Sequence, residues 1–286
     1  MRLPPHVEDK VREALAEDIG MGDLTSELVV PEGAWAVAEV VAKEGGILAG
    51  VREARAAFEL LGARILEAME DGSPVRPGDV VMRVEGPARA LLAAERTALN
   101  FLMRMSGIAT ATAELLRRAR EANPRVRVAA TRKTAPGLRY FDKRAVELGG
   151  GDTHRLRLDD CVLIKDNHIA VVGSVAEAVR RAREAVSFTK KVEVEVERPE
   201  EALEAAKAGA DIIMLDNFTV EEVEKALRLL EEAGLRDRVL VEVSGRIRPE
   251  NVADYARAGV DIISSGYITH SARALDFSMR IVSSRT

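Results

Sequence analysis

Basic side chains are concentrated between Thr131 and His168, although the formal net charge of the protein is −5 at pH 7. Turn-forming triplets, Ala135-Pro136-Gly137 and Gly149-Gly150-Gly151, separate them and place them on loops. The stretch predicts a binding site for a molecule with several negative charges; a solvated, ion-paired face is the alternative. The basic residues are Arg132, Lys133, Arg139, Lys143, Arg144, His154, Arg155, Arg157 and Lys165.

Polar residues also follow the short apolar runs in the second half of the chain. In parallel α/β folds, ligands bind at the carboxyl ends of the strands, where such residues would meet. Any one of these groups alone is equally well explained as a helix cap. The groups rich in Gly and Ser predict phosphate binding through backbone N–H groups. The five groups are Thr131-Arg132-Lys133, Lys165, Asp216, Ser244-Gly245-Arg246 and Ser265-Gly266-Tyr267.

The segment Val192–Glu197 alternates valine and glutamate, which puts the two residue types on opposite faces of a strand. In a barrel the valines would pack under helices and the glutamates would point inward. Buried carboxylates need a cation, so this face predicts Mg²⁺ or basic side chains nearby, with Arg132, Lys133 and Lys165 as candidates. The alternative is an edge strand with a solvated acidic face.

Strand-like runs alternate with helical stretches from Val126 onward, which predicts a parallel sheet. An internal repeat supports a barrel-like architecture: Pro-Glu is followed after eight residues by Gly-x-Asp-Ile-Ile at 199–213 and again at 249–263. The runs number six or seven, so the barrel is expected to be incomplete. They are Val126–Ala130, Cys161–Ile164, Val192–Val196, Asp211–Leu215, Val239–Val243 and Asp261–Ser264.

The first hundred residues lack this alternation and predict a separate α+β domain. A helix is expected from Ala88 to about Met105, a break at Gly107, and a further helix over Ile108–Glu121. Arg96 recurs with Asn100 and Arg104 on one stripe of the first helix, which by itself is typical of solvated surface.

Composition excludes several classes of protein. Aromatic residues at 3% and a pI near 5.6 argue against a nucleic-acid partner. The single Cys161 excludes an internal disulfide framework and suits a reducing cytosol, so a cytoplasmic location is expected. No apolar run reaches membrane-spanning length, and we expect no signal peptide and no membrane partner.

Among possible chemistries, a nucleophilic triad and a zinc site find no support, because no Ser or Cys has an activating neighbour and the histidines lack ligand spacing. A Schiff-base lysine, Lys133 or Lys165, is feasible in a barrel lyase. Many cations together with paired acids best suit a polyanionic substrate and an Mg²⁺–diphosphate.

Several long strings resemble the quinolinate phosphoribosyltransferase family along nearly the whole chain. They are EDIGMGDLTS, AERTALNFLMRMSGIAT, the stretch from Thr131 to Asp160, LIKDNHI, VEVEV, IIMLDNF, VEVSG and THS. The resemblance implies an N-terminal α/β-sandwich domain over residues 1–105, joined by the tail 270–286, and an open barrel of about seven strands over 106–269. It also implies a homodimer or a higher assembly of dimers, such as a hexamer, in which subunits share active sites.

The resemblance also implies residue roles. Quinolinate would be held by Arg132, Lys133, His154, Arg155 and Lys165, with Thr131 beside them and Arg96 reaching in from the neighbouring subunit. Glu195 and Asp216 would hold the ribose and Mg²⁺ of phosphoribosyl diphosphate. Ser244-Gly245-Arg246 and Ser265-Gly266-Tyr267 match the phosphate loops, but the family more often has Gly or Asn in place of Arg246, and small apolar residues in place of Ser265 and Tyr267.

The implied reaction joins quinolinate to the ribose of phosphoribosyl diphosphate and releases diphosphate and CO2, giving nicotinate mononucleotide for NAD biosynthesis. Lys133, Lys165, Glu195 and Asp216 are the expected catalytic residues; Mg²⁺ is expected with the diphosphate, and no tightly bound organic cofactor is. The alternatives are a related transferase acting on another carboxylated base, a Schiff-base lyase, and a binding protein without turnover.

Overall fold

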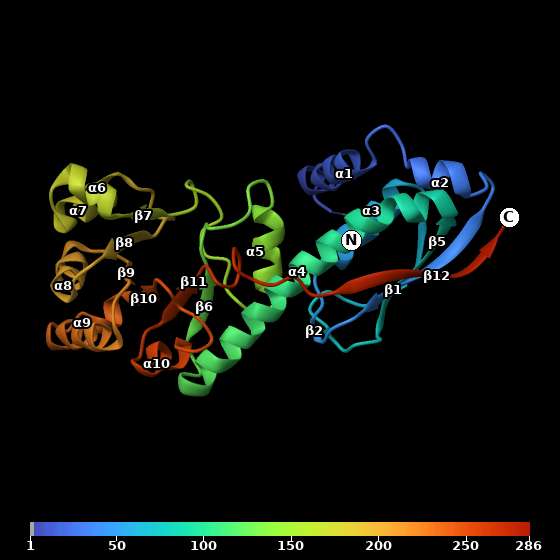
Figure 1. Ribbon diagram of the computed structural model, residues 1–286. Coiled ribbons are helices and arrows are strands. Elements are labelled where there is room, and N and C mark those ends of the chain that lie inside the picture. The colour runs from blue at the N-terminus through green and yellow to red at the C-terminus, as the bar shows by residue number, and fades with distance from the viewer. Residues whose placement is uncertain (1–2) are drawn as a thin grey trace. The chain divides into compact units, whose positions relative to one another are not determined.

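The structure is a computed structural model that describes residues 3–286, and the chain divides into two compact units. The first unit contains the residues up to Ala111 together with Tyr140–Gly149 and Ala272–Thr286. The second contains Thr112–Arg139 and Gly150–Ser271. Segments far apart in the sequence therefore complete each unit (Figure 1).

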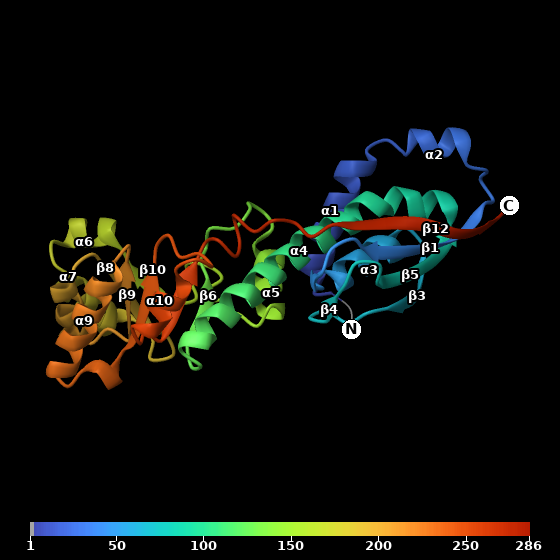
Figure 2. The same cartoon turned by 60° about the horizontal axis from the view of Figure 1, so that its bottom comes forward.

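The first unit is built on an antiparallel sheet with the strand order β12-β1-β5-β3. β12 pairs with β1 along its whole length, so the end of the chain completes this sheet (Figure 2). The strands are β1 (Trp35–Ala42), β3 (Arg64–Ala68), β5 (Val80–Pro87) and β12 (Phe277–Arg285), and a small second pair joins β2 (Gly46–Ile47) to β4 (Pro74–Val75).

The helices of the first unit are α1 (Pro5–Ile19), α2 (Leu24–Val29), α3 (Val51–Leu60), α5 (Arg139–Leu148) and most of α4 (Ala88–Ala122). The sequence predicts α5 within the second domain, whereas the structure groups it with the first unit. Asp142 of α5 is fully buried and accepts two hydrogen bonds from Arg104 of α4, each 2.8 Å long. This bidentate ion pair neutralises the buried carboxylate of Asp142 and joins α5 to α4.

The break expected at Gly107 is wrong, because α4 is one uninterrupted helix of 35 residues. Gly107 is instead a point of close approach within the first unit. A Cβ atom at this position would lie 2.1 Å from the carbonyl oxygen of Arg273. The glycine lets the segment before β12 cross directly over the helix, and the N–H of Leu275 there donates to Met103 O at 2.9 Å.

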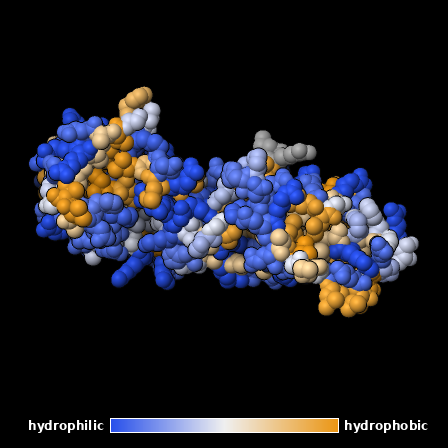
Figure 3. All heavy atoms as spheres, turned by 90° about the horizontal axis from the view of Figure 1, so that it is seen from above, coloured by the Kyte–Doolittle hydropathy of each residue, from blue (hydrophilic) through white to orange (hydrophobic). Residues whose placement is uncertain are grey.

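Apolar side chains are exposed around α2, where Met21, Leu24, Leu28 and Val29 are all more than two-thirds accessible. In the view of Figure 3, hydrophobic atoms form separate patches among the hydrophilic atoms of the surface. An apolar patch of this kind is typical of a surface that another protein covers. Within the described residues, no helix is both long and apolar enough to cross a membrane.

The second unit contains a parallel sheet with the order β6-β11-β10-β9-β8-β7. Six strands are present in the described residues, where about seven were expected; beside β6 only a single bridge joins Ala129 to Asp152. No ladder joins β7 to β6 among these residues, so the sheet is open, as predicted. The strands are β6 (Arg127–Ala130), β7 (Val162–Ile164), β8 (Val192–Val196), β9 (Ile212–Asp216), β10 (Leu240–Ser244) and β11 (Ile262–Ser265).

Helices connect these strands, as the alternating pattern predicts. Asp211 and Asp261, which occupy the same place in the two repeats, each accept a 2.8 Å hydrogen bond from the first residues of the neighbouring strand, at Val192 N and Val241 N. The connecting elements are α6 (Asp166–Val172), α7 (Val175–Ala185), α8 (Pro199–Ala208), α9 (Val220–Glu232), the 3₁₀ helix η1 (Arg236–Arg238) and α10 (Val252–Arg257).

Valine and glutamate alternate along β8, so the two residue types lie on opposite faces of the strand, as expected. Val192, Val194 and Val196 are buried beneath the helices. Glu195 pairs in register with Met214 of β9, which pairs with Glu242 of β10, and paired residues in a parallel sheet share a face. The glutamates of β8 and β10 therefore line the concave side of the open sheet.

Candidate active site

The sheet of the second unit brings the predicted polar groups to one edge. Because its strands are parallel, their carboxyl ends lie together. Thr131, Lys165, Asp216, Ser244 and Gly266 each stand at or directly after such an end. Three predicted site residues lie elsewhere: Arg96 is on the part of α4 that belongs to the first unit, and His154 and Arg155 follow the isolated bridge at Asp152.

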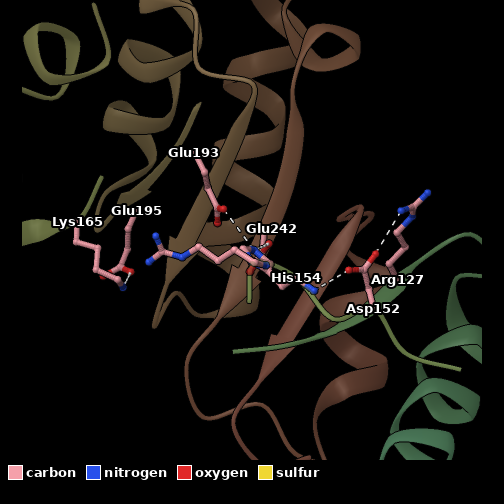
Figure 4. A network of polar contacts seen from close by, with 8 residues as sticks. Arg127, Asp152, His154, Lys165, Glu193, Glu195 and Glu242 are labelled. Carbon is pink, nitrogen blue, oxygen red and sulfur yellow. Dashed lines mark hydrogen bonds and ion pairs between the residues drawn. The ribbon is translucent and has the colours of Figure 1, made fainter. Parts of the chain in front are cut away.

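Acidic and basic side chains lie together at this edge. Nζ of Lys165 forms an ion pair with Oε2 of Glu195, whose side chain is almost buried (Figure 4). Burial raises the pKa of Asp216, and the charge of Glu195 raises it further, while Lys165 and Lys133 lower it. Asn217 donates to Asp216 Oδ2 at 2.6 Å. Two carboxylates in mutual repulsion beside ammonium groups suit a ligand that brings both a metal cation and anionic oxygens.

The basic loop after β6 is fixed by the protein itself. Lys133 N donates to Thr131 Oγ1 at 3.1 Å, and the hydroxyl of Thr269 donates to Lys133 O at 2.8 Å. Nε of Arg132 is buried and has no hydrogen-bond partner in the described part of the chain. A buried guanidinium N–H group in this state requires an acceptor, which an anionic ligand would supply.

His154 lies inside the sheet between two fully buried glutamates. Its Nε2 atom is 3.2 Å from Glu242 Oε2 and 3.3 Å from Glu193 Oε2 (Figure 4). Burial lowers the pKa of His154, but the two carboxylates raise it by more, to about 10. The Nδ1 atom accepts a 2.8 Å hydrogen bond from Arg155 N, which opposes a second ring proton. Both ring nitrogens of His154, expected to touch substrate, thus already have protein partners.

The two predicted phosphate loops differ in how their side chains are used. Gly245 has a φ of 99°, and a Cβ there would lie 2.4 Å from Asn217 Oδ1, so only glycine fits. Arg246 follows with a φ of 54°, a left-handed backbone that glycine or asparagine adopts more readily. Ser265 donates its hydroxyl to Ile247 O at 2.7 Å and accepts from Tyr267 N, so this hydroxyl braces the loop.

The comparisons with known proteins agree along the whole chain. Residues 23–106 match the model of the quinolinate phosphoribosyl transferase N-terminal domain, and residues 108–280 match that of its C-terminal domain. This chain belongs to the quinolinate phosphoribosyltransferase family.

Individual members of the family are similar over most of their length. A probable carboxylating nicotinate-nucleotide pyrophosphorylase of Methanothermobacter thermautotrophicus is 51% identical over 96% of this chain and 98% of its own. The human carboxylating nicotinate-nucleotide pyrophosphorylase is 43% identical over 84% and 80%. Among solved structures, NadC from Streptococcus pyogenes has a TM-score of 0.91 at 40% identity, covering 100% of this chain and 99% of the other.

For this member of the family, the sequence assigned no role to several residues of the concave face. Ile262 of β11 pairs in register with Glu242, and Ser264 lies two residues further on the same face of the strand. The buried hydroxyl of Ser264 has no hydrogen-bond partner among the described residues. Glu193 was expected to point inward only as part of the alternation in Val192–Glu197, and Glu242 was not singled out, although both are fully buried. The signal for all three was the two-residue period, which places every second residue of a strand on the inner face.

A cavity of about 690 Å³ lies at the opposite, amino-terminal edge of the same sheet. It reaches His154, Arg155 and Glu193 from that side, but Lys133, Lys165 and Asp216 are not among its lining residues. Several of its charges are paired within the protein, including Arg236 with Asp261 at 2.9 Å. The carboxyl edge, which has the acids and the lysines, remains the candidate active site of this phosphoribosyltransferase.

Proposed function

We propose that this protein is a quinolinate phosphoribosyltransferase, which transfers the phosphoribosyl group of phosphoribosyl diphosphate to the nitrogen of quinolinate. Diphosphate leaves, the 2-carboxylate is lost as CO2, and a proton replaces it to give nicotinate mononucleotide. The observation that carries the proposal is the arrangement of Lys165, Glu195 and Asp216 at one edge of the sheet, beside the loop that contains Lys133.

The two substrates make different demands, which different residues meet. Quinolinate is a rigid dicarboxylate, and Arg132, Lys133 and Lys165 provide the cations to hold it. The unpartnered Nε of Arg132 supports this role. The loops at Gly245 and Gly266 are the candidates to bind the phosphate through backbone N–H groups. The protein thus orients nitrogen toward ribose C1, which is the main contribution to a two-substrate reaction.

Charge develops at two places during transfer. The ribosyl centre becomes cationic as diphosphate leaves, and Glu195 or Asp216 is placed to stabilise it. The loss of CO2 leaves a carbanion that the alkylated, cationic ring nitrogen stabilises. Lys133 and Lys165 are the candidates to supply the proton that replaces CO2.

Mg²⁺ fits the acidic residues of this edge. The pKa of Asp216 is raised by burial and by Glu195, so a divalent cation would relieve their repulsion. Glu195 and Asp216 would hold the ion with the diphosphate, and the ion would supply stabilisation of the leaving group's charge.

Assembly and location belong to the same proposal. A homodimer, alone or within a larger assembly, would cover the exposed apolar residues of α2 and let Arg96 serve the partner's site. Two functional domains are proposed, with the division near residues 105 and 270, and α5 grouped with the first. A cytoplasmic location remains a prediction from the single cysteine.

The test is to incubate the purified protein with quinolinate, phosphoribosyl diphosphate and Mg²⁺, and to measure nicotinate mononucleotide and CO2 together. Equal amounts of both products are expected. Nucleotide formation from another carboxylated base without CO2 would assign the protein to a related transferase. Trapping of a keto acid by borohydride would favour a Schiff-base lyase.

A further inference from the structure

Three side chains from distant segments meet inside the second unit beneath the candidate active site. His154 follows the Asp152 bridge, Glu193 is in β8 and Glu242 is in β10. Both glutamate side chains are completely buried. Oε2 of each glutamate lies close to His154 Nε2, at 3.3 Å for Glu193 and 3.2 Å for Glu242, and Oε1 of neither has a hydrogen-bond partner in the described part of the chain. The contacts with His154 Nε2 are therefore the main polar contacts of two costly buried carboxylates.

The hydrogen bonds of His154 give the ring a direction. Nδ1 accepts from Arg155 N at 2.8 Å, which places the ring proton on Nε2, where it faces Glu193 and Glu242. The backbone N–H of His154 donates in turn to Asp152 Oδ1 at 2.8 Å. Since His154 has a left-handed φ of 50°, these bonds hold a backbone shape that costs free energy for this residue type.

A metal site is the competing interpretation, because the three ligand atoms lie within 4.8 Å of one another. A histidine nitrogen that binds a metal carries no proton, however, and the other nitrogen normally donates a hydrogen bond. Here the direction is reversed, because Nδ1 accepts. The cluster therefore fits a hydrogen-bonded support better than a metal centre.

We propose that Glu193 and Glu242 are positioning residues that hold His154 by Nε2 and thereby fix the backbone of Arg155, which directs its guanidinium toward a carboxylate of the aromatic substrate. His154 then acts as the link between two buried acids and a substrate-binding arginine. The inference deepens the proposed function and rests on it.

The test compares two substitutions at Glu242. Glu242→Gln keeps an oxygen that can accept from Nε2, whereas Glu242→Met keeps the approximate size and removes the acceptor. We expect the Met variant to raise the dissociation constant of quinolinate roughly tenfold, the factor that one lost hydrogen bond commonly gives. The dissociation constant of phosphoribosyl diphosphate should change less than about twofold, and the Gln variant should recover most of the quinolinate affinity.

Glu39→Met is the matched control, because Glu39 is also a buried strand glutamate but pairs with Arg83 and Arg280 in the first unit. This variant should lower the stability of the protein without changing the dissociation constant of one substrate more than that of the other. Isothermal titration calorimetry measures the dissociation constants of quinolinate and of phosphoribosyl diphosphate. Titration with diphosphate alone tests the phosphate loops separately. Equal weakening of both substrates in Glu242→Met, or no recovery in Glu242→Gln, would overturn the proposal.

A second measurement does not depend on activity. The ring proton on Nε2 of His154, shielded and hydrogen-bonded, should give a downfield proton resonance in the free protein that disappears in His154→Gln. It should shift in Glu193→Gln and Glu242→Gln and stay unchanged in Glu39→Met. If the wild type turns over no quinolinate but this pattern holds, the proposed function fails while the support of His154 stands. A resonance unaffected by either glutamine substitution contradicts the support itself.

Discussion

Several carboxylates of this protein are buried or nearly buried, and each depends on one or two basic partners. Lys165 and Glu195 show this at the carboxyl edge, and Glu39 shows it in the first unit, where Arg83 and Arg280 bond its two oxygens. The arginines hold the pKa of Glu39 below its usual value. Buried acids without such partners should dominate the response of the protein to pH and mutation.

Lys165→Ala should lower kcat/KM, with a loss of about 2–5 kcal/mol of transition-state stabilisation. The substitution removes a cation that would contact the substrate, and it leaves the carboxylate of Glu195 without its basic partner. Steady-state kinetics with each substrate varied measures this loss. Lys225→Ala is the control, since Lys225 forms an equally direct ion pair with Glu200 on exposed helix surface. Near-normal turnover of Lys165→Ala would remove Lys165 from the active site.

Glu53 should make the first unit less stable as pH rises. Burial raises its pKa to about 7, with a smaller contribution from Asp71, and its Oε2 has no hydrogen-bond partner in the described residues. Between about pH 4.5 and 7 the folded protein binds a proton that the unfolded chain has lost, so the free energy of unfolding falls with pH by about 3 kcal/mol.

Glu53→Gln should therefore flatten the pH dependence of stability in this window and stabilise the protein at pH 8. Denaturant titrations at a series of pH values measure both effects. Glu59→Gln, on the exposed face of the same helix α3, should leave the slope unchanged. A Glu53→Gln protein with the wild-type slope would show that Glu53 ionises normally in the folded state.

At the scale of elements, the loops after the strands decide how closely a ligand can approach the backbone. Gly245 combines a positive φ with contact to Asn217. Gly245→Ala should weaken binding of phosphoribosyl diphosphate and cost about 1–3 kcal/mol of stability, from strain and the clash together. Calorimetric titration and denaturant unfolding measure the two losses.

Gly259→Ala provides a matched control, because Gly259 has almost the same φ, 98°, but no atom within 4 Å of the added Cβ. It should lose stability through strain alone and bind both substrates normally. If the two alanine variants bind phosphoribosyl diphosphate equally well, the close packing at Gly245 does not serve the phosphate loop.

At the scale of the whole molecule, the proposed dimer makes Arg96 testable. Arg96→Ala and Lys133→Ala homodimers should each be almost inactive, because each site lacks one substrate contact. Mixing them with subunit exchange should restore one intact site in each heterodimer, which amounts to roughly a quarter of wild-type activity. Exchange is followed by mass spectrometry. If exchange occurs and activity does not return, Arg96 does not serve the partner's site.

The sequence by itself determined the alternation of strands and helices in the second unit and the polar residues at the strand ends. These are local properties, because side-chain period and turn chemistry act over a few residues. The inward direction of the glutamates in β8 followed from the same period. The long motifs around Lys133 and Lys165 indicated the family, which the comparisons confirmed.

Only the tertiary structure decided which residues meet. His154 and Glu242 are 88 positions apart, and no local pattern pairs them. The continuity of α4 through Gly107 depends on a segment that returns more than 160 residues later to pack on it, a contact that helix propensity does not encode. Contacts between distant segments satisfy buried groups, and their partners are fixed only when the whole chain has folded.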